Sequence, residues 1–373
     1  MKEIRIVFAG GGTGGHLYPA LAIAQGLRKP LAPANCQIDF IGTRRGLEYR
    51  MRDTLEYPLH LIPGRGVRRA LDWRNALVPF AALGALWSSW RLLRSLRPHL
   101  VVGTGGYVSG PVALVAKLRG TLTVIQEQNS SPGVTTRLLA PWMDRVYLGF
   151  AESREKLSRR ARVCVTGNPV REEIGRATQA SARAHFGLDP AKTTILILGG
   201  SLGAISVNRA VLRHLDTLSE SVQLLWQTGE RDYDTTRAIV GERRNCHIVP
   251  FIPRMELAWA AADVAVCRAG ALTIAELLVT RTPAVLIPYP HATDDHQTAN
   301  ALSIERMGAG IHLADHDLAQ HNPLAQALSL TQGPTRAAMI CAMDKWNNSV
   351  APGATARIAD DIVTLFHERG VIS

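Results

Sequence analysis

Short apolar runs, often closed by glycine, alternate along the chain with stretches of helical period. The apolar runs cover residues 4–9, 38–41, 100–102, 122–125, 195–198 and 284–287. Between them, residues 20–27 and 112–118 place apolar side chains at helical spacing. Strands that alternate with helices form parallel sheets with helices on both faces. The pattern therefore predicts an α/β fold.

Two of these runs lead into glycine-rich turns that stand about half a chain apart. Residues 10–15 read Gly-Gly-Gly-Thr-Gly-Gly, and residues 199–204 read Gly-Gly-Ser-Leu-Gly-Ala. A strand, a glycine turn and a helix start together present unpaired backbone N–H groups and a positive dipole end to an anion. Because each turn can open a domain, the duplication predicts two doubly wound domains that face each other across a cleft.

The length of 373 residues also favours two domains over one. Near the middle, a predicted strand ends in the stop Gly167-Asn168-Pro169, which suits a domain boundary. We therefore predict an N-terminal domain over residues 1–164 and a C-terminal domain over residues 165–349. The last stretch, residues 350–373, has a helical pattern and could fold back onto the first domain.

The cysteines form no C-x-x-C pair, which disfavours a disulfide framework and a zinc site. They are Cys36, Cys164, Cys246, Cys267 and Cys341. Scattered in this way, they are typical of buried thiols in a reducing compartment. Met1 leads straight into the first predicted strand, so we expect no signal peptide and a cytosolic protein.

Positive charge is concentrated in the first half of the chain. Residues 1–172 carry 25 Lys and Arg against 11 Asp and Glu, a net charge of +14, whereas residues 173–373 carry 17 against 20, a net charge of −3. A basic half attracts nucleic acid or anionic phospholipid, although it can also be a merely solvated face. Since no zinc-finger, RRM or KH signature is present, we expect no nucleic-acid partner.

The segment over residues 65–97 combines arginines with a long uncharged stretch. Residues 75–90 carry no charge and include Trp87 and Trp90, with arginines on both sides. These 16 residues are fewer than the roughly 20 that cross a bilayer. Such a helix suits a membrane interface, where tryptophan rings lie at headgroup depth and arginine meets anionic lipid. A core helix with an arginine-rich surface is the alternative.

The first glycine turn is dense enough to press its backbone against a phosphate or a sugar. It lacks the Gly-Lys-Ser/Thr of a Walker loop and differs from the G-x-G-x-x-G of dinucleotide-binding proteins. His16 follows the turn at the start of a helix. A neutral imidazole there can serve as a general base, or it can simply cap or pack.

Further polar turns follow other predicted strands, at the sheet edge where ligands of open α/β folds bind. They cover residues 103–111, 126–129 and 267–276. Glu276 would lie in the first turns of a helix, where it can accept both hydroxyls of a ribose or merely complement the helix dipole. Residues 291–296 hold two histidines and two aspartates without the spacing of a zinc motif, so we expect no metal.

Seven motifs resemble those of the MurG family in their order and spacing. They cover residues 11–16, 105–111, 127–129, 167–171, 199–201, 267–273 and 295–300. The resemblance runs from about residue 4 to residue 300, and the tail is less distinctive. Two positions depart from it, since Leu202 stands where many members have Gln and Gln126 where many have His. The second departure weakens a catalytic role for position 126.

The resemblance implies a GT-B fold, with two Rossmann-like domains and an interdomain cleft. MurG enzymes are inverting transferases of peptidoglycan synthesis that need no metal at the pyrophosphate. They move N-acetylglucosamine from UDP-N-acetylglucosamine to the 4-hydroxyl of the N-acetylmuramic acid of undecaprenyl-linked lipid I, which gives lipid II. The resemblance also implies a peripheral protein at the cytoplasmic face of the inner membrane, without a transmembrane helix. Residues 65–97 would then meet anionic phospholipid.

The same resemblance implies roles for individual residues. His16 would be the base for the acceptor hydroxyl, Glu276 would bind the ribose, and Gln297 the sugar hydroxyls. The donor sugar would be contacted by Thr13, Gly14, Gly15 and Asn129, and the diphosphate by Arg171 and Ser201. The uracil would be framed by Ile252, Ala271, Leu272 and Thr273, in a substrate-binding segment that continues through Ile274 and Ala275. The acceptor would meet Gly105, Tyr107 and Glu127.

Other functions remain as alternatives. A UDP-N-acetylglucosamine 2-epimerase would share the two-domain plan and the donor site but would need no membrane segment. An NAD oxidoreductase fits the first glycine turn poorly. A nucleic-acid binder would explain the basic half without any enzymatic site.

Overall fold

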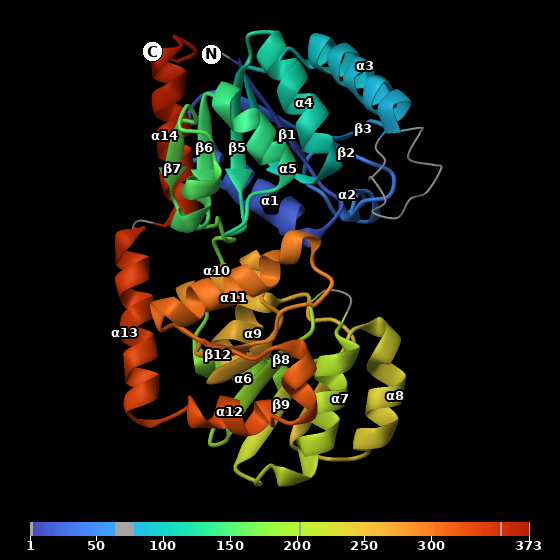
Figure 1. Cartoon of the computed structure of the whole chain (residues 1–373), viewed down its shortest axis with the longest axis vertical. Coiled ribbons are helices and arrows are strands. Elements are labelled where there is room, and N and C mark those ends of the chain that lie inside the picture. The colour runs from blue at the N-terminus through green and yellow to red at the C-terminus, as the bar shows by residue number, and fades with distance from the viewer. Residues whose placement is uncertain (1–2, 64–77, 201–202, 351–352, 373) are drawn as a thin grey trace. The chain divides into compact units, whose positions relative to one another are not determined.

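The computed structural model describes residues 3–63, 78–200, 203–350 and 353–372, which divide into two compact units (Figure 1). The first unit comprises Met1–Arg171 with Pro352–Ser373, and the second comprises Glu172–Ala351. The break therefore comes later than the predicted one after residue 164. The reason is that strand β7 (Val163–Val165) pairs with β6 (Arg145–Leu148) and so belongs to the first sheet.

The first unit is built on a parallel sheet of seven strands in the order β3-β2-β1-β4-β5-β6-β7. Its remaining strands are β1 (Glu3–Gly10), β2 (Asn35–Gly42), β3 (Leu59–Leu61), β4 (Leu100–Gly105) and β5 (Leu122–Glu127). Its helices are α1 (Gly14–Arg28), α2 (Leu47–Arg50), α3 (Val78–Leu96), α4 (Gly106–Leu118), α5 (Val134–Leu139) and α14 (Ala354–Glu368), with 3-10 turns η2 (Ala140–Trp142) and η3 (Ala151–Lys156).

The second unit has a parallel sheet of six strands in the order β10-β9-β8-β11-β12-β13. The strands are β8 (Thr193–Leu198), β9 (Val222–Gln227), β10 (Cys246–Val249), β11 (Val264–Cys267), β12 (Ala284–Leu286) and β13 (Ile311–His312). The helices are α6 (Gln179–Phe186), α7 (Ile205–His214), α8 (Glu230–Val240), α9 (Met255–Ala261), α10 (Ala271–Thr280), α11 (His296–Met307), α12 (Pro323–Ser329) and α13 (Gly333–Ser349), with 3-10 turns η4 (Leu215–Thr217), η5 (Thr293–Asp295) and η6 (Asp315–Ala319).

Both sheets confirm the predicted α/β class with Rossmann-like winding. Each apolar run of the sequence lies in a strand, except that Ile287 comes just after β12, and these strands are buried because helices cover both faces of a parallel sheet. The strand order reverses between β1 and β4 in one sheet and between β8 and β11 in the other. Ligands of such sheets bind outside the carboxyl ends of the strands at these reversals. The glycine turns after β1 and β8 lie at those two positions.

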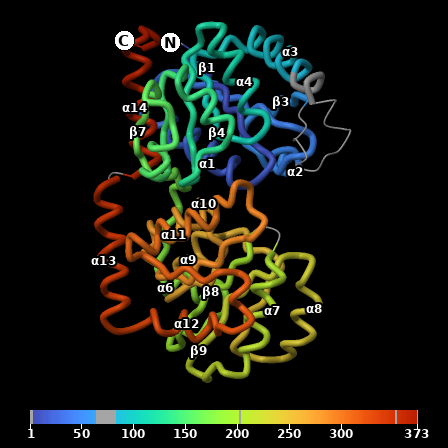
Figure 2. The backbone as a smooth tube through the Cα atoms, in the orientation of Figure 1, coloured from blue at the N-terminus to red at the C-terminus, as the bar shows by residue number. Residues whose placement is uncertain are grey.

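The C-terminal helix completes the core of the first unit. Helix α14, drawn in red in Figure 2, packs on α1, and its Ile358, Ile362 and Phe366 are fully buried in the cluster that also holds Phe8. Asp361 of α14 accepts hydrogen bonds from the hydroxyl of buried Tyr147 at 2.8 Å and from the Arg145 guanidinium at 2.9 Å. Burial, together with the negative charge of Asp361, raises the pKa of the Tyr147 hydroxyl well above its usual value.

The cysteines are only partly as predicted. All five are free thiols, and Cys267 at the end of β11 is fully buried, which raises its pKa to about 12. Cys36, Cys164 and Cys246 are half-buried, and Cys341 in α13 is exposed. The expectation of buried thiols is therefore confirmed in full only for Cys267 and is wrong for Cys341.

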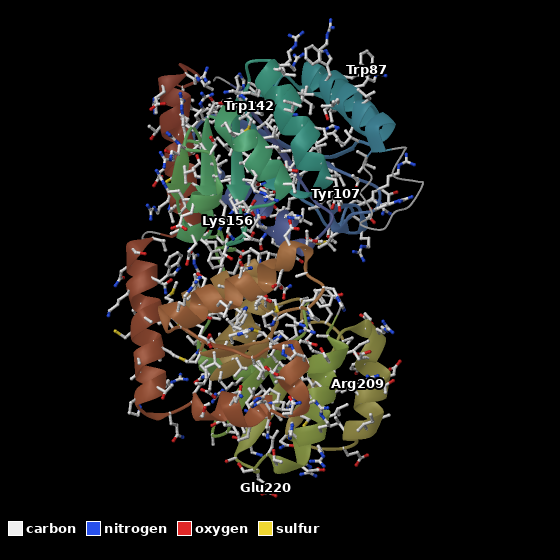
Figure 3. All side chains as sticks on the ribbon, viewed as in Figure 1. Trp87, Tyr107, Trp142, Lys156, Arg209 and Glu220 are labelled. Carbon is white, nitrogen blue, oxygen red and sulfur yellow. The ribbon has the colours of Figure 1, made fainter. Side chains whose placement is uncertain are left out.

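Helix α3 presents an inner and an outer surface. It packs beside α4 (Figure 1) and buries Ala85 and Leu93, whereas Leu83 is 63% exposed and Trp87, at its outer edge (Figure 3), is 70% exposed. Residues 64–77 of the arginine-flanked segment lie outside the described residues. Among the residues that the structure describes, no helix is both long enough and apolar enough to cross a bilayer.

Candidate functional site

In the first unit, three polar loops meet at the carboxyl ends of β1, β4 and β5. A Cβ atom added to Gly106 would lie 2.6 Å from the carbonyl oxygen of Gly11, so the first two loops are in direct contact. The amide of Gln128 donates to the carbonyl oxygen of Thr104 at 2.8 Å and joins the third loop to the second. The predicted convergence of these loops is therefore observed.

His16 lies in the first turn of α1, between the loops. Its Nδ1 atom is 3.1 Å from the carbonyl oxygen of Gly11 and 3.4 Å from Oγ1 of Thr13. Its ring faces Gly105, where an added Cβ would lie 2.6 Å from the ring Cδ2. Gly105 has φ +103°, a conformation that favours glycine. The ring thus packs against the loops, and its position suits a base presented at the sheet edge.

No sequence pattern indicated Glu48, whose side chain accepts a hydrogen bond from the backbone of the first glycine loop. It is 1% exposed, and its carboxylate accepts the N–H groups of Gly12 at 2.7 Å and Thr43 at 2.9 Å. Glu48 lies in the first turn of the short helix α2. A carboxylate at such a position is ordinarily exposed to solvent. Only the tertiary contact with the glycine loop reveals its role.

Glu127 hydrogen-bonds its own loop. The side chain is 5% exposed, and one carboxylate oxygen accepts the backbone N–H of Asn129 at 3.2 Å. The other accepts the N–H of Gly133 at 3.0 Å and the hydroxyl of Thr136 at 2.6 Å. Glu127 therefore organises the loop that carries Asn129, and its contact with the acceptor stays a prediction.

The other predicted residues of this unit lie around the same loops. Thr13 and Gly15 are exposed, Gly14 is half-buried, and Tyr107 is 64% exposed. Gln126, the position that departs from the family pattern, is buried and donates to Oδ1 of Asn168 at 2.9 Å. Its role is therefore structural.

Arg171 ends the first unit, and its guanidinium lies 5.4 Å from the centre of the Tyr18 ring. Because Tyr18 belongs to α1, the positively charged guanidinium lies near the start of that helix. Ser201, its predicted partner at the diphosphate, lies outside the described residues.

In the second unit, Gln227 ties the glycine turn after β8 to the loop after β10. Its Nε2 donates to the carbonyl oxygen of Gly200 at 2.9 Å, and its Oε1 accepts the N–H of Ile252 at 2.8 Å. Gln227 is 3% exposed, at the end of β9. An added Cβ at Gly203 would lie 2.1 Å from the carbonyl oxygen of Thr228, so the turn needs glycine there. The sequence prediction included Ile252 but missed Gln227.

Glu276 projects from α10, the helix that follows β11. One of its carboxylate oxygens accepts the indole N–H of Trp259 at 2.7 Å. Trp259 is 1% exposed, so it holds the carboxylate in a fixed place. The predicted segment Ala271, Leu272, Thr273, Ile274 and Ala275 forms the first turns of the same helix. A carboxylate held in one orientation is well suited to accept hydrogen bonds from a diol.

Gln297 lies in the first turn of α11, which follows the loop after β12. Oε1 of Gln297 accepts the N–H of Tyr289 at 2.9 Å, and Oδ1 of Asp295 accepts the hydroxyl of Thr298 at 2.7 Å. Of the polar side chains of residues 291–296, Asp295 and His296 thus bind the local backbone and the start of α11. In the described parts of the chain, no three His, Cys, Asp or Glu side chains are grouped so that they could hold a metal ion.

Arg268 joins four segments at the carboxyl edge of the second sheet. The side chain is 8% exposed and donates to the carbonyl oxygen of Pro288 at 2.9 Å and to the hydroxyl of Ser206 at 2.8 Å. It also pairs with Asp315 at 2.5 Å, and Asp315 in turn accepts the Ser206 hydroxyl at 2.7 Å. This network fixes the loops around the glycine turn.

Two family models match the chain. The glycosyltransferase family 28 N-terminal domain matches residues 6–148, and the glycosyltransferase family 28 C-terminal domain matches residues 194–350. The first match lies within the first unit and the second within the second unit. The two matches leave the C-terminal helix α14 uncovered.

Curated relatives match almost the full length. A protein of Chlorobium phaeobacteroides named UDP-N-acetylglucosamine--N-acetylmuramyl-(pentapeptide) pyrophosphoryl-undecaprenol N-acetylglucosamine transferase is 42% identical, covering 97% of this chain and 99% of its own. A protein of the same name from Salinibacter ruber is 43% identical over 96% of both chains.

Solved structures share the architecture. The crystal structure of Acinetobacter baumannii MurG has a TM-score of 0.73 at 30% identity and covers 98% of this chain and 100% of that one. A putative UDP-N-acetylglucosamine 2-epimerase from Listeria monocytogenes has a TM-score of 0.71 at 13% identity, with 99% and 98% covered. At 13% identity, the similarity to the epimerase structure shows only a shared fold.

Proposed function

The chain belongs to the MurG family of glycosyltransferases with a GT-B fold, and from this we infer that it transfers N-acetylglucosamine from UDP-N-acetylglucosamine to lipid I, forming lipid II. The observation that carries this function is the 42% identity to a transferase of that name over 97% of the chain. The epimerase alternative has support only from the fold.

We assign the nucleotide to the second unit. The carboxylate of Glu276, fixed by Trp259, would accept the two ribose hydroxyls, and the uracil would lie against Ile252 and the start of α10. The diphosphate would meet the backbone N–H groups of the glycine turn after β8, where helix α7 begins. Arg171 and Ser201 would add a guanidinium and a hydroxyl, and Gln297 would bind the sugar hydroxyls.

The chemical step follows from these assignments. Nε2 of His16 would take the proton from the 4-hydroxyl of the acceptor's N-acetylmuramic acid while that oxygen bonds to the anomeric carbon. The bond from the anomeric carbon to the β-phosphate oxygen breaks, and UDP leaves on the opposite face, which inverts the configuration. Negative charge that develops on the leaving UDP is stabilised by the helix start and by Arg171. Thr13, Gly14, Gly15 and Asn129 would contact the donor sugar, and Gly105 and Tyr107 the acceptor.

Replacing Glu276 with alanine should weaken UDP binding by about 10- to 100-fold, since hydrogen bonds to a charged group contribute about 1.5–3 kcal/mol. Calorimetric titration with UDP and with 2′-deoxy-UDP measures the effect. The wild type should prefer UDP, and the variant should lose that preference because the carboxylate that reads the diol is gone. The matched control is Glu220→Ala, which removes an exposed acid of the same unit. Unchanged UDP affinity in the Glu276 variant would remove the ribose assignment.

We propose that α3 attaches the protein to the cytoplasmic face of the membrane. The helix exposes Leu83, Trp87 and Trp90, and the guanidinium of Arg119 lies 4.9 Å from the centre of the Trp90 ring. Aromatic rings beside arginines are typical of side chains that insert at the headgroup level of anionic lipid. The net charge of +14 over residues 1–172 also favours binding to anionic lipid.

Trp87→Ala should lower binding to phosphatidylglycerol vesicles by about 20- to 200-fold. This estimate assumes that about half of the tryptophan surface is buried in lipid at ~25 cal/mol per Å². Vesicle sedimentation measures the loss of binding. The control is Ile239→Ala, which removes an apolar side chain of the second unit that is 63% exposed. Equal loss from both variants, or none from Trp87→Ala, would contradict attachment through α3.

Incubation with UDP-N-acetylglucosamine and a lipid I analogue tests the function as a whole. A transferase releases UDP and forms the disaccharide lipid only when both substrates are present. An epimerase would instead convert UDP-N-acetylglucosamine without any acceptor. Parallel reactions with and without EDTA test the expectation that no metal is needed.

A further inference from the structure

The mechanism described above gives no part to Glu48, a buried carboxylate of the first unit. Glu48 is 1% exposed and accepts the N–H groups of Gly12 and Thr43. The hydroxyl of Thr43 donates to Oε1 of Glu48 at 3.4 Å, and the same oxygen accepts the Thr43 N–H group. A carboxylate is costly to bury unless it is hydrogen-bonded, so its position points to a role for the group that it binds. That group is the backbone of the glycine loop.

The N–H group bound by Glu48 and the carbonyl group bound by His16 belong to the same peptide unit. Glu48 accepts the N–H of Gly12 at 2.7 Å, and the carbonyl oxygen of Gly11 lies 3.1 Å from Nδ1 of His16. In a planar peptide these two groups point in opposite directions and are coupled by resonance. An anion on the N–H side therefore polarises the carbonyl oxygen and makes it a better acceptor.

This contact also determines which ring nitrogen of His16 carries the proton. A carbonyl oxygen has no proton to donate, so Nδ1 must be the donor in this hydrogen bond. In the neutral ring, Nε2 then carries the lone pair. Oγ1 of Thr13, 3.4 Å from Nδ1, is compatible with this tautomer as a second, weaker acceptor.

We propose that Glu48 is a positioning residue that acts through the Gly11–Gly12 peptide to hold His16 in the Nδ1–H tautomer, with Nε2 as the proton acceptor. The arrangement resembles the carboxylate–histidine pair of serine hydrolases, with one peptide unit inserted between the two side chains. The inference rests on the proposed role of His16 as the base, but the tautomer itself can be measured without turnover.

Three glycines around Glu48 provide independent support. An added Cβ would lie 2.3 Å from the carboxyl carbon of Glu48 at Gly11, 2.4 Å from its Cγ at Gly42 and 2.0 Å from an oxygen at Gly46. None of these three glycines has a positive φ, so backbone conformation does not require glycine there. The space taken by the Glu48 side chain does require it.

Two variants disturb the contact in different ways. Glu48→Gln keeps the shape but cannot accept both N–H groups, because one oxygen becomes an NH₂ donor. Gly46→Ala keeps the carboxylate but pushes it from its place, since the added methyl group would overlap it. The control is Asp144→Asn, which alters another buried carboxylate of the same unit, one that accepts the N–H of Thr123 at 2.9 Å. Any general effect of losing a buried charge appears in this control.

The primary measurement is ¹⁵N NMR of histidine-labelled protein, in which the spectrum of His16→Ala identifies the His16 signals among the 12 histidines. We expect the wild type and Asp144→Asn to show the Nδ1–H tautomer at His16, and both disturbed variants to show a tautomer mixture. With UDP-N-acetylglucosamine and a lipid I analogue, kcat should fall about 10-fold or more in both, a part of the 10²–10⁴-fold that a general base contributes. The KM for the donor should change by less than about 2-fold.

The outcomes separate the two claims. An unchanged His16 tautomer in folded Glu48→Gln and Gly46→Ala would overturn the inference, and so would a kcat loss no greater than that of Asp144→Asn. If Glu48→Gln does not fold, Gly46→Ala decides alone. If the tautomer shifts as expected but His16→Ala keeps normal turnover, the link from Glu48 to His16 stands and the base assignment fails.

Discussion

Replacing His16 with alanine should lower kcat by about 10²–10⁴-fold, the range that a positioned general base contributes. The imidazole is held at the start of α1 by the Gly11 carbonyl and faces the loop of Gly105. Without it, the acceptor hydroxyl has to lose its proton to water, and the attack on the anomeric carbon becomes slow. Steady-state kinetics with UDP-N-acetylglucosamine and a lipid I analogue measure the change.

The donor should still bind to this variant. UDP is assigned to the second unit, around Glu276 and the glycine turn after β8, so its dissociation constant should stay within about 2-fold of the wild-type value. A matched comparison is His16→Gln, which retains hydrogen bonding but cannot accept a proton at neutral pH. Near-normal kcat in either variant would exclude His16 as the base.

Replacing Arg268 with alanine should lower the free energy of unfolding by about 3–5 kcal/mol, because it leaves a partly buried carboxylate and several polar groups without their partner. The guanidinium binds the carbonyl oxygen of Pro288, the hydroxyl of Ser206 and the carboxylate of Asp315. Chemical denaturation followed by circular dichroism measures the loss.

The contrasting variant is Arg243→Ala. Arg243 also pairs with an aspartate, Asp216, but the two side chains are 43% and 84% exposed. Exposed ion pairs contribute about 0–1 kcal/mol, so this variant should unfold almost like the wild type. Equal losses in the two variants would mean that the Arg268 network adds nothing beyond an exposed pair.

Much of the fold could be predicted from the sequence, because it depends on local patterns. Apolar runs closed by glycine become buried parallel strands, and the carboxyl ends of such strands meet at one edge. That rule alone is sufficient to bring the loops of Gly11, Gly106 and Gln128 together. The boundary after residue 164 was misplaced because pairing of β7 with β6 is a tertiary contact.

The supporting residues of the site could not be predicted in the same way. These residues bind backbone or side-chain groups that are distant in the sequence, so the residues next to them give no sign of the contact. They are Glu48, Gln227 and Arg268. Glu127 adds a second case, since its position at a strand end predicts a ligand contact but gives no sign of the hydrogen bonds that it makes to its own loop. Motifs therefore locate a site, whereas the shell that holds it depends on three-dimensional packing.

Helix α14 has a consequence for synthesis on the ribosome. The core of the first unit includes Ile358, Ile362 and Phe366, which leave the exit tunnel only after the whole second unit. The second unit is continuous over Glu172–Ala351 and can fold before α14 has been synthesised. Until α14 emerges, the core of the nascent first unit lacks these apolar side chains. The first unit, although its synthesis starts earlier, can therefore complete its core only after the second unit has been made.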